Sequence, residues 1–157
     1  MTGQKRVALG FVLAMTACPT VAQDTILTVT GAVADSEITF TREDLMDLPQ
    51  HQLVTTTSVT DGTVAFEGFM VRDLLNAHDA EGEVVIATAL NDYQMEIPMS
   101  DFERFDVLGA MSMDGTELSP RDKGPIWIVY PRDDHTELQD IRYDTRWVWQ
   151  LVSLHVQ

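Results

Sequence analysis

Short apolar runs rich in β-branched residues recur along the chain from residue 24 to its end. Turn signals, many of them Asp-Gly or Asn-Asp pairs, separate these runs from one another. Runs of this length and composition are typical of β-strands. The clearest of them are ILTVTG at 26–31, QLVTTTSV at 52–59, EVVIATAL at 83–90 and GPIWIVYP at 124–131.

Helical patterns are fewer and shorter. Thr41 is a predicted N-cap for a helix over 42–48, with acidic residues in its first turn and a proline just beyond it. Residues 70–78 place apolar side chains at i, i+3 and i+4, which predicts a second helix. A capping box opening at Ser100 predicts a single turn, and 137–143 is predicted as a further turn. The expected fold class is therefore α+β, a mainly β mixed-sheet domain with short inserted helices.

The first 22 residues have the pattern of an export signal. Lys5 and Arg6 precede a short apolar stretch, and small residues lead to a cleavage point after Ala22. The apolar stretch is shorter than the ~20 residues that span a bilayer, so no transmembrane span is expected in the mature chain. We expect 1–22 to be a signal peptide, 24–157 to be one domain, and the protein to be periplasmic or secreted.

Cys18 is the only cysteine and offers a second interpretation of the same segment. The sequence Met15-Thr16-Ala17-Cys18 resembles a bacterial lipoprotein box, so lipid attachment at Cys18 is the alternative to cleavage after Ala22. Cleavage after Ala22 would leave no cysteine, which excludes disulfides, thiolate catalysis and thiolate metal ligation in the mature domain.

The chain is strongly acidic, with 10 Lys and Arg against 25 Asp and Glu. Removal of the signal peptide leaves 8 against 25 and moves the formal charge from −15 to −17. Such a surface repels nucleic acid and anionic lipid, because both bind through Lys and Arg. We therefore expect no nucleic-acid partner; a solvated acidic face of an exported protein accounts for the composition.

The order and spacing of several short motifs resemble one known family. In sequence order these motifs resemble the oxidoreductase molybdopterin-binding domain of sulfite oxidases and of the catalytic subunit of periplasmic methionine sulfoxide reductases. The resemblance spans nearly all of 24–157, and small exported bacterial proteins carrying this domain alone are the most similar group. The motifs are FTx₃Lx₂LP at 40–49, FEGFx₄LL at 66–75, NDYx₃IP at 91–98, GPIx₂VxP at 124–131 and the closing strand to Val156.

The same resemblance exposes departures from the enzymes' chemistry. The cysteine that ligates molybdenum in the family falls at Thr56, twelve residues before Gly68, and a threonine hydroxyl cannot replace a soft thiolate. The enzymes commonly carry a phosphate-gripping arginine where this chain has Trp127, whose side chain has one N–H donor and no charge. Arg146 retains a third landmark, a basic residue facing the pterin. We therefore expect no molybdenum chemistry and no cofactor, with molybdopterin as the alternative.

The segment after the apolar run at 124–131 holds the best candidates for a binding site. Arg132 and His135 in this segment and Arg146 further along could converge on a small anion, with Tyr130 and Trp127 as an apolar wall. Together with Thr56, these three are also the predicted cofactor-binding residues. The alternative is that the two arginines form ion pairs that hold the loop before the last strand. The acids available for this are Asp133, Asp134, Asp140 and Asp144.

Two sets of potential metal ligands are present, and neither has the spacing of a known site, so no metal site is predicted. Carboxylates and a histidine near residue 135 would suit Ca²⁺ or Zn²⁺, and methionines would suit Cu(I). Methionines at strand spacing more often fill a core. The sets are Asp133, Asp134, His135 and Glu137, and Met95, Met99, Met111 and Met113.

Residues 147–154 alternate as expected for a strand with one buried face, and Trp147 and Trp149 on one side would form a partner surface or a lid. The predicted function is an exported molybdopterin-binding-domain-like protein without molybdenum chemistry. It would act as a periplasmic binding or accessory module for a small anionic ligand or for a periplasmic or membrane protein. The alternatives are a molybdopterin-dependent oxidoreductase and an interaction protein that docks through the two tryptophans.

Overall fold

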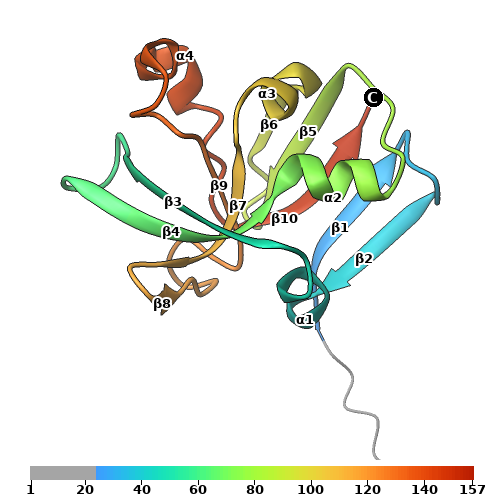
Figure 1. Cartoon of the computed structure of the whole chain (residues 1–157). Helices are drawn as coiled ribbons and strands as arrows, with labels where there is room; N and C mark the ends of the chain where they lie inside the picture. The colour runs from blue at the N-terminus through green and yellow to red at the C-terminus, as the bar shows by residue number, and fades with distance from the viewer. Residues whose placement is uncertain (1–23) are drawn as a thin grey trace, which may run out of the picture.

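The computed structural model describes residues 24–157 and consists of two β-sheets with short helices between their strands (Figure 1). The predicted signal peptide at 1–22 and the alternative of lipid attachment at Cys18 lie outside the described residues. The predicted α+β class, mainly β with short inserted helices, is confirmed.

The first sheet, on the right in Figure 1, has the strand order β2-β1-β10-β5-β6. The first and last strands pair in parallel, with Val29 opposite Leu154, and the other neighbours are antiparallel, so the sheet is mixed. The last strand of the chain therefore lies at the centre of the sheet. The strands are β1 (Thr25–Gly31), β2 (Glu37–Thr41), β5 (Val84–Ala89), β6 (Gln94–Pro98) and β10 (Leu151–Val156).

The second sheet has the order β3-β4-β7-β8, and β9 pairs with β7. Its strands approach very closely at Gly68 on β4, where a Cβ atom would overlap the carbonyl oxygen of Gly109 on β7. Only glycine fits this crossing, which explains the glycine of the FEGF motif. The strands are β3 (Gln50–Thr56), β4 (Thr63–Met70), β7 (Leu108–Met113), β8 (Thr116–Glu117) and β9 (Trp127–Val129).

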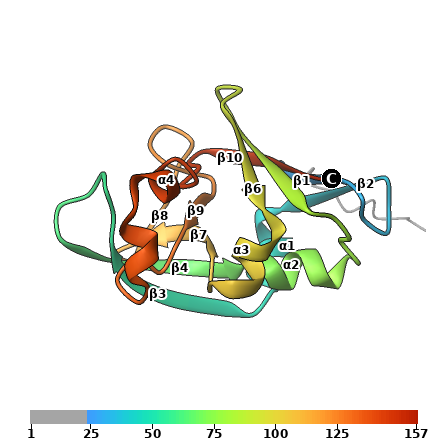
Figure 2. The ribbon, with the colours of Figure 1, turned by 90° about the horizontal axis from the view of Figure 1, so that it is seen from above.

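Two predicted helices are confirmed. Helix α1 (Arg42–Met46) begins at Thr41, whose hydroxyl accepts from the Asp44 N–H while the Asp44 carboxylate accepts from Thr41, a capping box. These hydrogen bonds hold the pKa of Asp44 below its usual value. Helix α2 (Val71–Ala77) buries its predicted apolar stripe and contacts α3 and β4, as Figure 2 shows from above.

The prediction at Ser100 is wrong in its details. Helix α3 (Met99–Arg104) begins two residues earlier than a cap at Ser100 predicts, with Pro98 in the capping position and no side-chain cap, so Ser100 lies inside the helix. Asp101, in the first turn of this helix, is buried. Its carboxylate accepts hydrogen bonds from Tyr130 and Arg146, which are distant in sequence. A local capping pattern therefore cannot reveal that Asp101 is buried.

The predicted turn at 137–143 is two short pieces, the 3₁₀ helix η1 (Thr136–Gln139) and helix α4 (Ile141–Asp144). The Asp140 side chain caps α4, and its hydrogen bonds with Arg142 lower the pKa of Asp140 to about 2.

The predicted strand over 147–154 is also shorter than expected. Gln150 has a φ of 52°, in the left-handed region, so the extended run is interrupted and β10 begins at Leu151. The residues before the break run beside β9 instead, where the Val148 carbonyl accepts from the Ile128 N–H at 2.9 Å. The two tryptophans therefore precede the strand, and the rings of both pack edge-on against Trp127.

Candidate functional site

The end of β3 is tied to the loop after β9 by three hydrogen bonds. The backbone N–H and the hydroxyl of Thr56 donate to the two carboxylate oxygens of Asp133, at 2.8 and 2.6 Å. In return the Asp133 N–H donates to the Thr55 hydroxyl at 3.2 Å. The carboxylate therefore faces the hydroxyl of the residue that the family resemblance aligns with the metal-ligating cysteine.

The three consecutive threonines each have a structural partner. Thr55 is fully buried, and its hydroxyl accepts the Asp133 N–H. Thr57 is also buried, and its hydroxyl bonds that of Thr60 at 2.7 Å and accepts from the Val59 N–H at 3.1 Å. β-branched hydroxyl side chains suit this place because they fit a strand and also satisfy backbone groups where the strand ends.

Arg146 takes part in a buried polar cluster with Asp101 and Tyr130. Its guanidinium Nη1 donates to Asp101 Oδ2, and the Tyr130 hydroxyl donates to the same oxygen at 3.0 Å. The guanidinium also lies 4.7 Å from the Tyr143 ring centroid. Burial, and then the charge of Asp101, hold the pKa of Tyr130 well above its usual value, so the phenol stays a neutral donor.

The other predicted anion-binding residues lie on the same loop between β9 and β10. Arg132 Nε is 3.9 Å from Asp144 Oδ1, one of the acids expected as its partner, and neither atom makes a hydrogen bond within the described chain. His135 packs edge-on against Phe105, with ring centroids 5.0 Å apart. The structure thus gives each arginine an acidic neighbour, and the anion site stays a prediction.

The candidate metal ligands do not converge. Asp133 bonds Thr56, while Glu137 forms an ion pair with Arg104 at 2.9 Å. Within residues 24–157, no three His, Cys, Asp or Glu side chains form a group that could hold a metal ion. Met95 lies on β6 of the first sheet and Met111 on β7 of the second, so the four methionines do not share one sheet.

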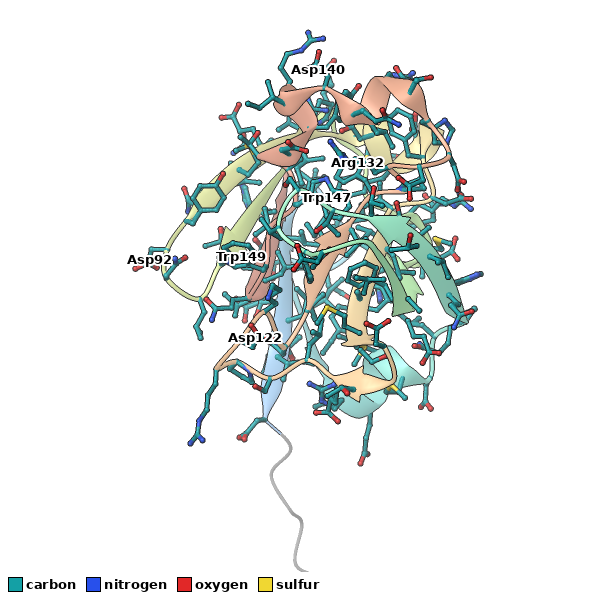
Figure 3. The ribbon with its side chains drawn as sticks, turned by 90° about the vertical axis from the view of Figure 1, so that its left-hand side faces the viewer. Asp92, Asp122, Arg132, Asp140, Trp147 and Trp149 are labelled. Carbon is teal, nitrogen blue, oxygen red and sulfur yellow. The ribbon has the colours of Figure 1, made fainter. Side chains whose placement is uncertain are left out.

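Three tryptophans meet beside this loop and form the walls of a pocket of about 260 Å³. Trp127, buried on β9, lies between Trp147 and Trp149, with ring centroids 6.2 and 6.3 Å away and planes inclined by 65° to each. Figure 3 looks onto this face and labels the latter two. The pocket is lined by Ser58, Val59, Ala89, Asn91, Tyr93, Trp127, Asp144, Thr145, Trp147, Val148 and Trp149.

The tryptophans differ in exposure, which the alternating pattern did not reveal. Trp147 is 8% exposed, whereas Trp149 is 41% exposed. Trp147 and Trp149 were expected to form a docking surface, but only Trp149 is substantially exposed. The rings of both pack against Trp127. The available signal in the sequence was that all three tryptophans of the chain lie in two strand-like segments near its end.

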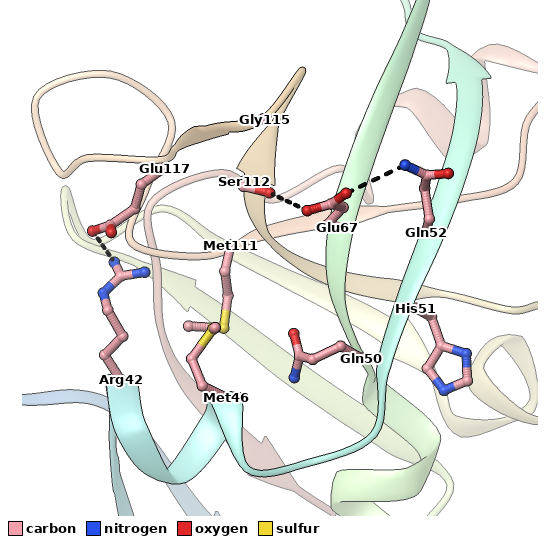
Figure 4. A pocket seen from close by; sticks show the side chains of 10 residues that line it. All are labelled: Arg42, Met46, Gln50, His51, Gln52, Glu67, Met111, Ser112, Gly115 and Glu117. Carbon is pink, nitrogen blue, oxygen red and sulfur yellow. Dashed lines mark hydrogen bonds and ion pairs between the residues drawn. The ribbon is translucent and has the colours of Figure 1, made fainter.

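A larger pocket of about 480 Å³, lined by more charged residues, lies between α1 and the second sheet (Figure 4). Its charged groups already have partners: Arg42 pairs with Glu117 at 3.3 Å, and Glu67 accepts hydrogen bonds from Gln52 and Ser112. Because these charged side chains already have partners within the protein, they are less available to a ligand. The aromatic pocket, with its exposed ring and few polar groups, is therefore the stronger candidate.

Comparisons with known proteins agree with this architecture. The profile of the oxidoreductase molybdopterin binding domain matches residues 15–133. The crystal structure of the sulfane dehydrogenase SoxCD from Paracoccus pantotrophus resembles this chain with a TM-score of 0.65 and 19% identity. The match covers 89% of this chain and 40% of that one, and at this identity it shows a shared fold. No curated protein sequence matches. Since the profile covers more than half of the chain, the chain belongs to the oxidoreductase molybdopterin-binding domain family.

Proposed function

We propose that this protein is an exported member of the family that has lost molybdenum chemistry and acts in the periplasm as a binding or accessory module. The observation that carries the proposal is the contact between Thr56 and Asp133. The remaining support comes from the two other positions that the resemblance aligns with cofactor contacts, Trp127 and Arg146.

The donor set at Thr56 does not fit a molybdenum centre. A threonine hydroxyl is hard and undissociated at neutral pH, unlike the soft thiolate that the family supplies. Here it also donates to the Asp133 carboxylate at 2.6 Å. An anionic pterin cofactor would meet that carboxylate at the place where its metal would need a ligand.

The two further positions point the same way. Trp127 is uncharged and fully buried where the enzymes commonly carry an arginine. Arg146 keeps its charge, but its guanidinium binds the buried carboxylate of Asp101. A phosphate at this place would have to compete with Asp101 for the cation, which makes a pterin pocket costly to form.

A metal assay on the purified domain tests the proposal. The protein is produced in a bacterial host that makes molybdopterin, alongside an authentic molybdenum enzyme as the loading control. Molybdenum is measured by mass spectrometry, and pterin by fluorescence after oxidation. We expect only traces of both in this protein and full loading of the control. Stoichiometric molybdenum and pterin would overturn the proposal in favour of a molybdopterin-dependent oxidoreductase.

The exported and accessory role is supported by the predicted signal peptide, the acidic composition and the exposure of the tryptophans. None of the helices within residues 24–157 is long and apolar enough to cross a membrane. The predicted signal peptide and the acidic composition suit a periplasmic protein. The low exposure of Trp147 favours a pocket for a ligand over docking through the two tryptophans. Capture of a partner from a periplasmic extract by wild type, lost in Trp149→Ala, would favour docking instead.

A further inference from the structure

We propose that the aromatic pocket formed by Trp127, Trp147 and Trp149 binds a small organic cation of the quaternary ammonium class. This names a ligand for the binding module proposed above and so rests on that function. It differs from the small anion that the basic residues of the loop suggested from the sequence.

The arrangement of the rings carries the inference. Trp147 and Trp149 flank Trp127 at centroid distances of 6.2 and 6.3 Å, and each plane is inclined by 65° to that of Trp127. Trp127 is fully buried and Trp147 nearly so, so the ring surface open to a ligand belongs mainly to Trp149 and Tyr93, which are 41% and 44% exposed. Tyr93 completes the rim, because its hydroxyl donates to the Thr145 carbonyl at 3.2 Å. The negative faces of aromatic rings attract cations, and cages of this kind bind quaternary ammonium groups.

The charges around the pocket also favour a cation. Among the described residues that line it, Asp144 is the only charged one, and none is Lys, Arg or His. Arg132 lies 3.9 Å from the Asp144 carboxylate and offsets part of its charge, so the rings must supply most of the attraction. Lys123, which pairs with Asp122, does not line the pocket, but its Nζ lies 5.7 Å from the Trp127 centroid, so the ring contacts with a bound cation fall to the other rings of the pocket.

The hydrogen-bonding groups argue against an anion in the same space. The indole nitrogens of Trp127 and Trp147 are buried and have no hydrogen-bond partner within residues 24–157. These N–H groups have almost no exposed surface, and the exposed ring atoms that line the pocket belong mainly to Trp149 and Tyr93. A carboxylate or phosphate would find no cationic donor there, whereas a quaternary ammonium group has no N–H and needs none.

The pocket's size restricts the ligand further. Its volume of about 260 Å³ lies below the range, from roughly 300 Å³ upward, of pockets for drug-sized molecules. A head group of the size of choline or tetramethylammonium fits this volume. The half-exposed Trp149 leaves one side open for the rest of a slightly longer molecule.

Tryptophan fluorescence provides a direct assay, because all three tryptophans of the chain line the pocket. The mature domain is titrated with choline chloride and, separately, with 3,3-dimethylbutan-1-ol, the neutral molecule of the same shape. Sodium chloride controls for ionic strength. We expect saturable binding of choline, with the neutral molecule at least about fivefold weaker, since only the cation gains the attraction of the rings.

Variants locate the site by calorimetry. Trp149→Leu should weaken choline binding about fivefold or more, and Trp149→Phe should restore most of it, because a ring face returns. Ile141→Ala is the matched control, since Ile141 is exposed and does not line the pocket. Thermal unfolding confirms that each variant is folded.

Three results would overturn the inference: equal binding of the neutral molecule, unchanged affinity in Trp149→Leu, or no saturable response to choline or tetramethylammonium. Molybdenum is measured in the same preparation, which separates the two proposals. Choline binding by a molybdenum-loaded protein would refute the proposed function alone. A molybdenum-free protein that binds no choline would refute the ligand class alone.

Discussion

Replacing Arg146 by methionine should test the buried cluster that distinguishes this protein from a pterin-binding one. The change removes the guanidinium that bonds Asp101 Oδ2 and leaves that carboxylate with the Tyr130 hydroxyl as its remaining side-chain donor. The Asp101 side chain is only 4% exposed, so water cannot replace the lost cation fully. The variant thus buries an uncompensated charge.

The magnitude follows from the exposure of the two partners. Removing one partner of a fully buried ion pair costs about 3–5 kcal/mol. The Arg146 side chain is 22% exposed, so the native pair is partly screened, and we expect a loss of about 2–3 kcal/mol. Asp101→Asn should cost less, about 1 kcal/mol, because the amide oxygen still accepts from Tyr130 and the freed Arg146 can reach water.

Urea unfolding followed by tryptophan fluorescence measures these free energies, provided the slopes with urea agree among variants. The double variant Arg146→Met with Asp101→Asn should lose less stability than Arg146→Met alone, since no buried charge remains. Tyr130→Phe serves as a second control, because it removes one hydrogen bond and leaves the ion pair. Equal losses in Arg146→Met and Asp101→Asn, or no loss in the former, would refute the reasoning.

Three further predictions concern other parts of the molecule. Above a pH near 10.0, the usual tyrosine pKa, the unfolded chain releases the Tyr130 proton while the folded protein keeps it. The free energy of unfolding should therefore be independent of this group below that pH and decrease above it. Urea titrations from pH 9 to 11 should show a shallower fall in Tyr130→Phe, and an equal fall would contradict this. Gly68→Ala should destabilise the fold by about 3 kcal/mol, because the added Cβ would overlap the Gly109 carbonyl. Gly62→Ala, where the Cβ meets open space, should cost only about 1 kcal/mol for its left-handed backbone. Equal midpoints of the two variants in thermal unfolding would refute this contrast. The intact mass of the protein purified from a periplasmic extract should match a chain that begins at Gln23. A mass that matches a chain beginning at a lipid-modified Cys18 would show that the protein is processed as a lipoprotein.

Much of the fold could be read from local patterns. The apolar runs with turns between them, the cap at Thr41 and the apolar stripe of α2 each depend on residues a few positions apart. Such signals persist whatever the rest of the chain does, because side-chain period and capping are properties of one element. The order of the motifs then identified the family. One of these motifs contains Gly68, which allows β4 and β7 to approach closely.

The site depended on contacts that no local pattern contains. Asp101 and Arg146 are 45 residues apart, and Thr56 and Asp133 are 77 apart. From the sequence, Asp101 was only the residue after the predicted cap at Ser100, and Asp133 was a candidate metal ligand or ion-pair partner. Both became clear only when the sheets brought their partners together.

The sequence by itself determined the strands, the fold class, the family and the acidic, cysteine-poor character of the predicted mature domain. Tertiary structure decided that Thr56 binds a carboxylate, that Arg146 is neutralised, and that three tryptophans surround one pocket. The left-handed Gln150 shows the reason on a small scale: one backbone angle ends the extended run, so that Trp147 and Trp149 precede the last strand and pack against Trp127. Such angles are held by the packing of distant segments, so the chemistry of the site emerges only with the fold.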